Sequence, residues 1–380
     1  MQFNRTSGSP PEKQIRIVFV VNSAIVGGAE KHTFDLARAL NQYGCKCWVF
    51  AIKRGKIEAP DGIRLLQPET NGRSQIGRMR DLAGVIQKEQ PDLIVGVNER
   101  PVLIAYFARA LARAHPPIIA ISHSTVLRNR KEELMQLAYT RLFNRIESVV
   151  FISDNQRKFW TARGWRPKQQ VTILNGIDIE RFSLSVRAEH RDRSRAELKF
   201  APDDFVIGCC AVLRPEKNHN QLVESVAHLR GKGIPAKALL VGDGPMRAEI
   251  EQRCTALGVT DHVIIAGMQP DVRPFIAAFD VGILCSISIE TLSLAALEVM
   301  AMGIPMVMSE LGGASEIVNG ENGMLFPVGD GSALVEALAK FFHDRDLAKT
   351  GAAARLTTEV KFDHRAMVAN YFNHFVHCCS

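Results

Sequence analysis

The chain has 380 residues, of which 46% are hydrophobic and 23% are charged. This length fits two ordinary globular domains, and this composition excludes an intrinsically disordered chain. The apolar runs stay well below the ~18 residues of a membrane-spanning helix, so we expect neither a spanning segment nor a secretory leader, and we predict a cytoplasmic location.

The net charge of +7 is unevenly distributed along the chain. Residues 1–195 contain 32 Lys and Arg against 18 Asp and Glu, whereas residues 196–380 contain 15 against 22. A strongly basic half predicts an acidic partner, which could be an anionic membrane surface, a phosphorylated acceptor or a nucleic acid. Because the chain has neither an aromatic RNP strand nor a GXXG clamp, we do not expect nucleic acid to be the partner.

Trp160 and Trp165 lie in a basic stretch, NQRKFWTARGWRPK, which runs from Asn155 to Lys168. Tryptophan and arginine both settle at the headgroup level of a bilayer, so the stretch favours peripheral binding to an anionic inner-membrane surface. A solvated helix with two core tryptophans is the alternative. The eight cysteines do not have the paired spacing of a zinc site, so we expect thiols without a bound metal.

The first half of the chain alternates apolar strand-like runs with helical patterns. After a polar tail over residues 1–14, the predicted strands are 15–21, 47–52, 92–97, 118–122 and 149–152. This alternation predicts a doubly wound parallel sheet, in which ligands bind at the carboxyl ends of the strands. Gly27 and Gly28 follow the first strand and His123 follows the fourth. The three-glycine dinucleotide fingerprint is absent, so NAD is not predicted.

The second half restarts the same pattern with a predicted strand over 205–213. Arg214 and Lys217 follow it, and both can bind a diphosphate, arginine through its planar fork and lysine as a point charge. The charged stretch before this strand is predicted to be a linker and a first helix. We therefore expect one domain over residues 1–190, completed by a C-terminal helix at about 363–380, and a second domain over 191–362.

The stretch from Ser286 to Leu325 is the most informative part of the sequence. Glu298 is its only charged residue between Thr291 and Ser309, in a run apolar enough to predict a buried helix with Thr291 or Ser293 as N-cap. A helix reaching both Glu290 and Glu298 would place them on similar faces about 12 Å apart. Two such acceptors suit the two ends of a polyhydroxylated ligand, and amides at the helix start suit an anion. Alternatively, Glu290 is a solvated loop residue and Glu298 an ion-pair partner.

This stretch, ETLSLAALEVMAMGIPMVMSELGGASEIV, resembles the E-x7-E signature of the retaining GT-B glycosyltransferases and is most similar to family 4. The strings VGGAEKH, HSTVLRN, VTILNGID and RPEKNH are also similar to motifs of this family, so the resemblance covers nearly the whole chain. It implies a GT-B fold, in which two Rossmann-like domains face a cleft. The first domain would bind the acceptor and the second the donor.

The resemblance also implies a reaction, the retaining transfer of a sugar from a nucleotide-diphosphate sugar to a glycan or lipid-linked glycan, in polysaccharide or lipopolysaccharide biosynthesis. It implies no cofactor or metal. Glu290 and His123 would be catalytic, Glu298 would bind the ribose, and Gly267 and Met268 would bind the base. The residues implied at the diphosphate are Arg214, Lys217, Gly27, Gly28, Thr291 and Leu292.

Two other classes of function fit the residues. One is a nucleotide-sugar epimerase or a phosphorylase, which would process its substrate without a large acceptor. The other is a non-catalytic basic module that binds a polyanion, whose binding would weaken steeply with salt.

Overall fold

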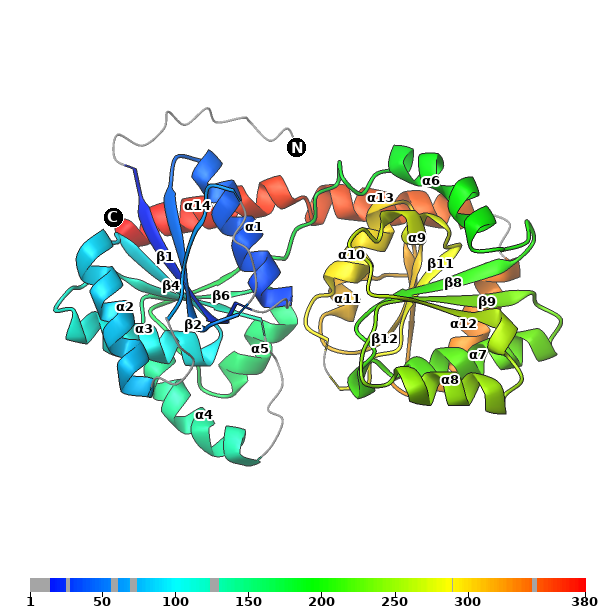
Figure 1. Cartoon of the computed structure of the whole chain (residues 1–380), viewed down its shortest axis with the longest axis horizontal. Helices are drawn as coiled ribbons and strands as arrows, with labels where there is room; N and C mark the ends of the chain where they lie inside the picture. The colour runs from blue at the N-terminus through cyan, green and yellow to red at the C-terminus, as the bar shows by residue number, and fades with distance from the viewer. Residues whose placement is uncertain are drawn as a thin grey trace. The chain divides into compact units, whose positions relative to one another are not determined.

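The computed structural model describes residues 14–24, 28–55, 61–68, 74–123, 130–288, 290–343 and 347–380. The chain divides into two compact units. Unit 1 comprises Met1–Ile152, Arg157–Ile173 and Val368–Ser380, and unit 2 comprises Ser153–Gln156 and Leu174–Met367. Each unit is a parallel sheet with helices on both faces (Figure 1), which confirms the predicted pair of doubly wound domains.

Unit 1 has a seven-stranded sheet in the order β3-β2-β1-β4-β5-β6-β7. The strands are β1 (Arg16–Ser23), β2 (Lys46–Lys53), β3 (Arg64–Leu66), β4 (Leu93–Val97), β5 (Ile118–Ser122), β6 (Ser148–Phe151) and β7 (Gln169–Thr172). The helices are α1 (Gly28–Gln42), α2 (Gln75–Glu89), α3 (Glu99–Leu111), α4 (Arg130–Phe143), α5 (Asp154–Ala162) and α14 (His364–Cys379), of which α5 and α14 begin in residues assigned to unit 2.

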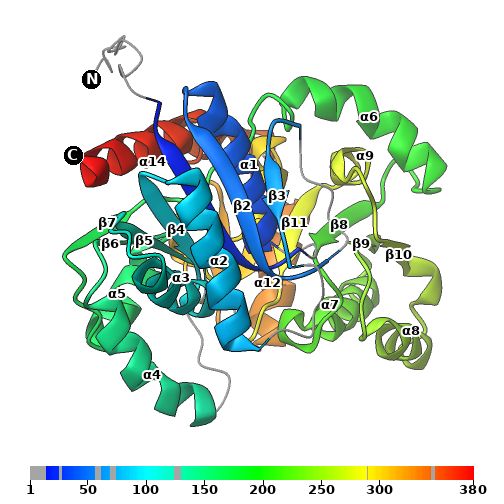
Figure 2. The same cartoon turned by 60° about the vertical axis from the view of Figure 1, so that its left-hand side comes forward.

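The inner strands of unit 1 are buried along all or most of their length, because helices cover both faces of the sheet. Every residue of β4 and β5 is buried, which explains their continuous apolar sequences. Helices α2 and α3 lie side by side on one face (Figure 2). The two edge strands, β3 and β7, are short and partly exposed, so they lack the pattern by which the inner strands could be predicted.

Trp160 and Trp165 belong to the core of unit 1. Their rings stack 4.3 Å apart between centroids, and Trp165 also stacks on Phe143 at 3.9 Å. Neither tryptophan is more than 1% exposed. The expectation that these two rings lie at a membrane surface is therefore wrong, because they bury their large apolar area among the other aromatic side chains of unit 1.

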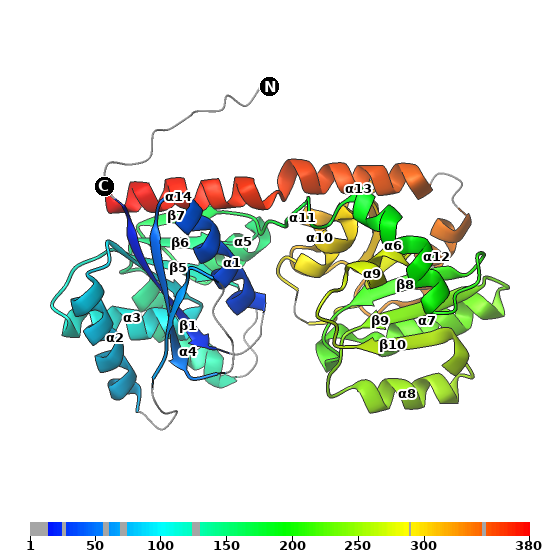
Figure 3. The same ribbon diagram turned by 45° about the horizontal axis from the view of Figure 1, so that its top comes forward.

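The C-terminal helix completes unit 1, as Figure 3 shows. Tyr371 and Phe375 are fully buried, and Phe375 contacts the ring of Phe19 in β1. At the start of β6, His374 Nε2 and the Ser148 hydroxyl lie 2.8 Å apart. Part of the core of the first unit thus comes from the last residues of the sequence.

Unit 2 has a six-stranded sheet in the order β10-β9-β8-β11-β12-β13. The strands are β8 (Phe205–Cys210), β9 (Ala236–Val241), β10 (Val263–Gly267), β11 (Val281–Leu284), β12 (Met306–Ser309) and β13 (Gly323–Phe326). The helices are α6 (Leu184–Glu197), η1 (Pro215–Lys217), α7 (His219–Gly231), α8 (Arg247–Ala256), η2 (Thr260–His262), α9 (Arg273–Ala277), α10 (Leu294–Ala301), α11 (Ala314–Ile317), α12 (Gly331–His343) and α13 (Leu347–Lys361).

Helix α6 belongs entirely to unit 2, whereas the predicted boundary at residue 190 would divide it. Its arginines explain the difference. Arg191 and Arg195 both pair with Asp280, at 2.6 and 3.1 Å, and Arg187 donates to the carbonyl oxygen of Gly303 at 2.9 Å. The helix is thus fixed to the sheet it precedes, and unit 2 begins its main segment at Leu174.

The cysteines are free, and six of the eight are buried, as expected for core thiols. Within the described ranges, no group of three or more His, Cys, Asp or Glu side chains is placed to hold a metal ion. The same ranges contain no helix that is both long and apolar enough to cross a bilayer.

Candidate functional site

The site in unit 2 lies where the strand order of its sheet reverses. From β8 the chain builds outward through β9 and β10, and then returns to add β11 on the other side of β8. The loops that follow β8 and β11 therefore leave the same edge of the sheet in opposite directions. In open α/β sheets this switch point at the carboxyl ends of the strands is where ligands bind.

Lys217 and Glu290 meet at this switch point. The Lys217 ammonium donates to Oε2 of Glu290 at 2.7 Å and lies 3.4 Å from the Ser286 hydroxyl. Ser286 donates to the same Glu290 oxygen at 2.9 Å. Glu290 is only 9% exposed and Ser286 is fully buried. The alternative that Glu290 is a solvated loop residue is therefore wrong.

The loop that carries Glu290 is pressed against a glycine turn. A Cβ atom at Gly312 would lie 1.6 Å from the carbonyl oxygen of Glu290, and one at Gly313 would lie 2.0 Å from that of Thr291. Gly312 also has a φ of +58°, which favours glycine. On the other side, the Ile287 amide donates to the carbonyl oxygen of Glu216 at 2.9 Å. These contacts hold the loop after β11 against the loop after β8.

Arg214 immediately precedes η1, and its side chain is 56% exposed. Its guanidinium lies 3.9 Å from the Glu216 carboxylate, which is a weak contact at an exposed position. The structure therefore brings Lys217 directly to Glu290, while Arg214 keeps a largely solvated charge three residues earlier.

Helix α10 begins at Leu294, with the Ser293 hydroxyl accepting from the Ala296 amide. Ser293 is thus the N-cap, one of the two expected. Thr291 and Leu292 precede the helix and are buried, so they lie just before its first turn. The separation of about 12 Å between Glu290 and Glu298 assumed a helix that reaches both, and it does not apply.

Glu298 lies in the middle of α10, half-buried as the helix packs into the sheet. Burial first, then the neighbouring Cys209 and then the negative charge of Glu298, raise the pKa of the Cys210 thiol well above its usual value. Burial first, and then the charge of Glu290, raise the pKa of Cys209 to about 12, against the opposite effect of Lys217. The charges of Glu290 and Glu298 therefore help to raise the pKa values of Cys209 and Cys210, the last two residues of β8.

Gly267 and Met268 lie at the end of β10. Gly267 has a φ of +72°, and its carbonyl oxygen accepts from the Gly242 amide at 2.9 Å. Met268 is 68% exposed. A Cβ at Gly244 would lie 2.5 Å from the carbonyl oxygen of Leu213, so the loop after β9 packs on the loop that leads to Arg214. The base-binding residues predicted from the sequence thus lie on the same sheet edge as Lys217.

His123 follows β5 in unit 1, as predicted. Its amide donates to Oδ1 of Asn98 at 2.8 Å, and Asn98 follows the neighbouring strand β4. The His123 ring makes an edge contact with the ring of His32, 4.9 Å between centroids. Gly28 is the first residue of α1, whereas Gly27 lies outside the described residues.

Burial lowers the pKa of His123 to about 4. The imidazole is therefore neutral at physiological pH and can donate or accept a hydrogen bond without carrying charge.

The stability of the fold should fall as the pH decreases from about 6.5 to 4, in part because of His123. In the unfolded chain the ring binds a proton near its ordinary pKa of about 6.5, but in the folded protein only near 4. Between these values the unfolded state binds more protons, so acid favours unfolding. His219, whose pKa burial also lowers to about 4, acts in the same direction.

Thermal unfolding of the wild type and His123→Gln from pH 4.5 to 7.5 measures this contribution. The variant should lose less stability in acid than the wild type. His115→Gln, at an exposed position, is the control and should follow the wild type. If the wild type and His123→Gln lost the same stability in acid, His123 would not contribute to the pH dependence.

Several residues of the two sheet edges could not be singled out from the sequence. Ser286 is one of several serines in its segment, and its role depends on the pairing of β8 with β11. Asn98 and His32 become neighbours of His123 only in the folded sheet. Glu316 accepts hydrogen bonds from the amides of Asp154 and Asn155 at 2.9 and 2.7 Å. None of these pairs is close in sequence.

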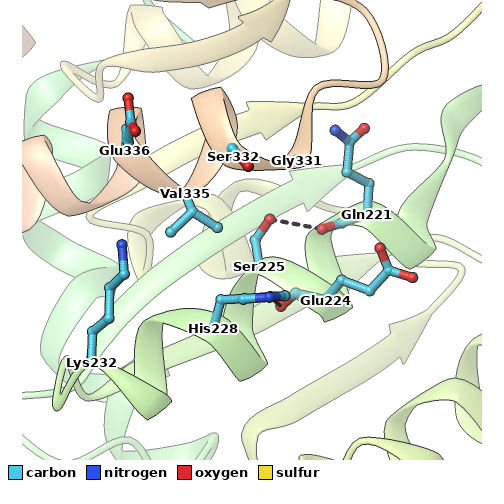
Figure 4. Close-up of a pocket in the computed structure, with 9 residues that line it drawn as sticks. All are labelled: Gln221, Glu224, Ser225, His228, Lys232, Gly331, Ser332, Val335 and Glu336. Atoms are coloured by element: carbon cyan, nitrogen blue, oxygen red, sulfur yellow. Dashed lines mark hydrogen bonds between the residues drawn. The ribbon is translucent and has the colours of Figure 1, made fainter.

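A cavity of about 340 Å³ lies between α7 and α12, as Figure 4 shows. Its lining mixes both signs of charge, with Glu224, Glu336 and Lys232 around it. None of the residues predicted to bind the donor lines it. This cavity is a groove between two helices and is distinct from the edge that carries Lys217 and Glu290.

Two protein-family profiles match the chain over most of its length. Glycosyltransferase Family 4 matches residues 26–181, and Glycosyl transferases group 1 matches residues 190–356. N-acetyl-alpha-D-glucosaminyl L-malate synthase of Bacillus anthracis is 33% identical over 76% of this chain and 76% of that protein. The lipopolysaccharide core biosynthesis glycosyltransferase LpsE of Rhizobium meliloti is 34% identical over 48% of this chain and 50% of LpsE.

The fold agrees with these matches. HepE of Anabaena, solved in complex with UDP, superposes with a TM-score of 0.83 at 22% identity, over 96% of this chain and 100% of HepE. At this identity the likeness establishes the fold alone, and the sequence relatives establish the family. The chain belongs to the group 1, family 4 glycosyltransferases of the GT-B fold.

Proposed function

We propose that this enzyme moves a sugar, with retention of its anomeric configuration, from a nucleotide-diphosphate sugar to a glycan or lipid-linked glycan acceptor, in polysaccharide or lipopolysaccharide biosynthesis. The observation that carries the proposal is the 2.7 Å ion pair of Lys217 and Glu290 at the switch point of the unit 2 sheet. A cation and a carboxylate there offer partners to a diphosphate and to a sugar hydroxyl. HepE, which shares the fold, was solved with UDP and with UDP-glucose.

In this proposal, the diphosphate binds to Lys217 and Arg214. Lys217 has three donors, so it can keep its hydrogen bond to Glu290 and still donate to a phosphate oxygen. Arg214, being largely exposed, gives up little when a ligand pairs with it. The backbone amides of Thr291 and Leu292, just before α10, complete the diphosphate site. These positive groups stabilise the charge of the departing diphosphate, so neither a metal ion nor another cofactor is required.

The remaining parts of the donor are assigned to the neighbouring loops. The transferred sugar donates a hydroxyl hydrogen bond to Glu290, and the ribose hydroxyls donate to Glu298. The base lies against Gly267 and the exposed Met268. In this assignment the sugar and the ribose are bound by the segment that follows β11, including α10, and the base by the end of β10.

We assign the acceptor-binding site to unit 1. Gly27, Gly28 and His123 are the residues that unit 1 contributes to the reaction. In the transfer, the bond from the sugar C1 to the phosphate oxygen breaks, and the acceptor oxygen bonds to C1 on the same face. The leaving phosphate oxygen takes the proton of the acceptor hydroxyl. A double displacement would need two carboxylates about 5 Å apart, whereas Glu290 is paired with a lysine.

We also propose that the enzyme works at the cytoplasmic face of an anionic membrane, where a lipid-linked acceptor would be anchored. The basic character of residues 1–195 supports this. So do exposed apolar side chains on two helices of unit 1, Phe107 and Leu111 on α3 and Leu137 on α4. Apolar side chains beside arginines are typical of surfaces that bind headgroups.

A thermal-shift screen of the purified chain against UDP-glucose, GDP-mannose and ADP-glucose tests the donor assignment. A donor at 100 times its dissociation constant should stabilise the fold by about 2.7 kcal/mol. Lys217→Met should abolish the shift, and Lys232→Met, at the exposed residue just after α7, should keep it. Release of nucleotide diphosphate that requires an added glycan distinguishes a transferase from an epimerase or a phosphorylase.

Sedimentation of the same preparation with phosphatidylglycerol vesicles tests the membrane assignment. Recovery of the protein in the supernatant would contradict it. The opposite combination, binding to the vesicles without a shift by any nucleotide sugar, would favour the non-catalytic basic module.

A further inference from the structure

We infer that Ser286 is a positioning residue, which with Lys217 holds one oxygen of the Glu290 carboxylate and reserves the other for the transferred sugar. The inference rests on the proposed function, because it assigns a partner within the same site. The Ser286 hydroxyl and the Lys217 ammonium donate to the same atom, Glu290 Oε2, at 2.9 and 2.7 Å. Among the described contacts of this carboxylate, both hydrogen bonds end on Oε2.

The hydrogen-bonding capacity of the three groups allows only one arrangement of protons. A serine hydroxyl has a single proton, and a carboxylate has none at neutral pH. Lys217 can donate to the Ser286 oxygen, 3.4 Å away, so the serine proton is free to point at Glu290. The direction of donation thus runs from the lysine and the serine to the carboxylate. Oε1 keeps its lone pairs for a hydroxyl of the ligand.

The backbone of Ser286 is itself fixed from two sides. The Ser309 hydroxyl, at the end of β12, donates to the carbonyl oxygen of Ser286 at 2.6 Å. The next residue, Ile287, donates its amide to Glu216. Ser286 and Ser309 are both at most 2% exposed. The serine hydroxyl therefore has a set position before any ligand arrives, and the carboxylate is oriented against it.

Orientation of this kind affects turnover more than binding. A glutamate has three rotatable side-chain bonds, and a carboxylate that rotates freely accepts a sugar hydroxyl in the productive geometry only part of the time. Lys217 has a second task at the diphosphate, so its loss should weaken both donor binding and turnover. In the assignment above Ser286 does not contact the ligand. Its loss should lower kcat and leave the affinity for the nucleotide nearly unchanged.

The test compares Ser286→Ala, Ser286→Thr and Ser225→Ala with the wild type. Ser225 is matched to Ser286 in burial, at 1% exposed, and its hydroxyl donates to Gln221 within α7 (Figure 4). We expect a decrease of kcat of about 10- to 100-fold in Ser286→Ala, a Kd for UDP, GDP or ADP within about twofold of the wild type, and partial recovery of kcat in Ser286→Thr. Ser225→Ala should have the kcat of the wild type.

A wild-type kcat in Ser286→Ala, or a Kd that rises as much as kcat falls, would overturn the inference. A second measurement does not depend on transfer. The Tm changes of Ser286→Ala and Glu290→Gln should not add in the double variant, because the two side chains are in direct contact. If the wild type transferred no sugar, the proposed function would fail, and additive Tm changes would separately show that Ser286 does not hold Glu290.

Discussion

Glu290→Ala should abolish measurable transfer, with kcat lowered by about 10²- to 10³-fold or more, the range found when one oriented group of a reaction centre is removed. Glu290 is 9% exposed and its carboxylate is held by Lys217 and Ser286, so the truncation removes an acceptor whose position is fixed. The measurement is the rate of nucleotide-diphosphate release with a saturating donor and acceptor, for the variant and the wild type.

Two further variants separate the chemical effect from a structural one. Glu290→Gln keeps the shape and an acceptor oxygen beside Lys217 but removes the negative charge, so it should retain the fold and still lose most activity. Glu321→Ala removes a carboxylate from an exposed loop of the same unit and should leave kcat unchanged. If Glu290→Ala kept more than half of the wild-type kcat, Glu290 would not have the catalytic role assigned to it.

Gly312→Ala should be among the most destabilising single-methyl substitutions in unit 2. The new Cβ would lie 1.6 Å from the carbonyl oxygen of Glu290, and the residue would have to keep a φ of +58°. The strain of the left-handed conformation and the forced shift of the backbone together should lower the free energy of unfolding by about 2–4 kcal/mol. Because the shifted backbone carries Glu290, kcat should fall as well.

Two other glycines of unit 2 provide matched controls for this substitution. Gly329 has a φ of +78° with no atom within 4 Å of a Cβ, so Gly329→Ala measures the conformational cost alone, about 1 kcal/mol. Gly320 has open space and an ordinary φ, so Gly320→Ala should change stability by less than about 0.5 kcal/mol. Urea unfolding monitors all three. If Gly312→Ala were no less stable than Gly329→Ala, the tight contact with Glu290 would not exist in solution.

The sheets could be predicted from the sequence because inner strands of a doubly wound fold are apolar on both faces. The run at 118–122 matches β5 residue for residue, and most other inner strands begin and end within two residues of the prediction. The helix that carries Glu298 was also evident, since only one charge interrupts it. Its start at Leu294 was not, because Thr291 and Ser293 are both favourable N-caps in isolation and the packing of the preceding loop decides between them.

The contacts that make the site depend on strand order, which local patterns do not contain. Lys217 and Glu290 are 73 residues apart, and they meet because β11 pairs with β8 and not with β10. For the two tryptophans, the local sequence pattern led to a wrong prediction. Their basic neighbours suggested a surface, but a residue between charged neighbours on a helix can still face the core when it lies on the inner side. Trp160 faces the core from α5, and Trp165, which follows α5, stacks on the ring of Trp160.

The assignment of the last thirteen residues to unit 1 bears on how this protein is made. During synthesis a domain folds as a unit once its whole chain is available. Unit 2 ends at Met367, so all of its residues have been synthesised by then. At that point unit 1 still lacks Val368–Ser380. Although it is first in sequence, unit 1 must wait for Tyr371 and Phe375 to fill its core. The nascent chain thus completes the residues of unit 2 first and those of unit 1 last.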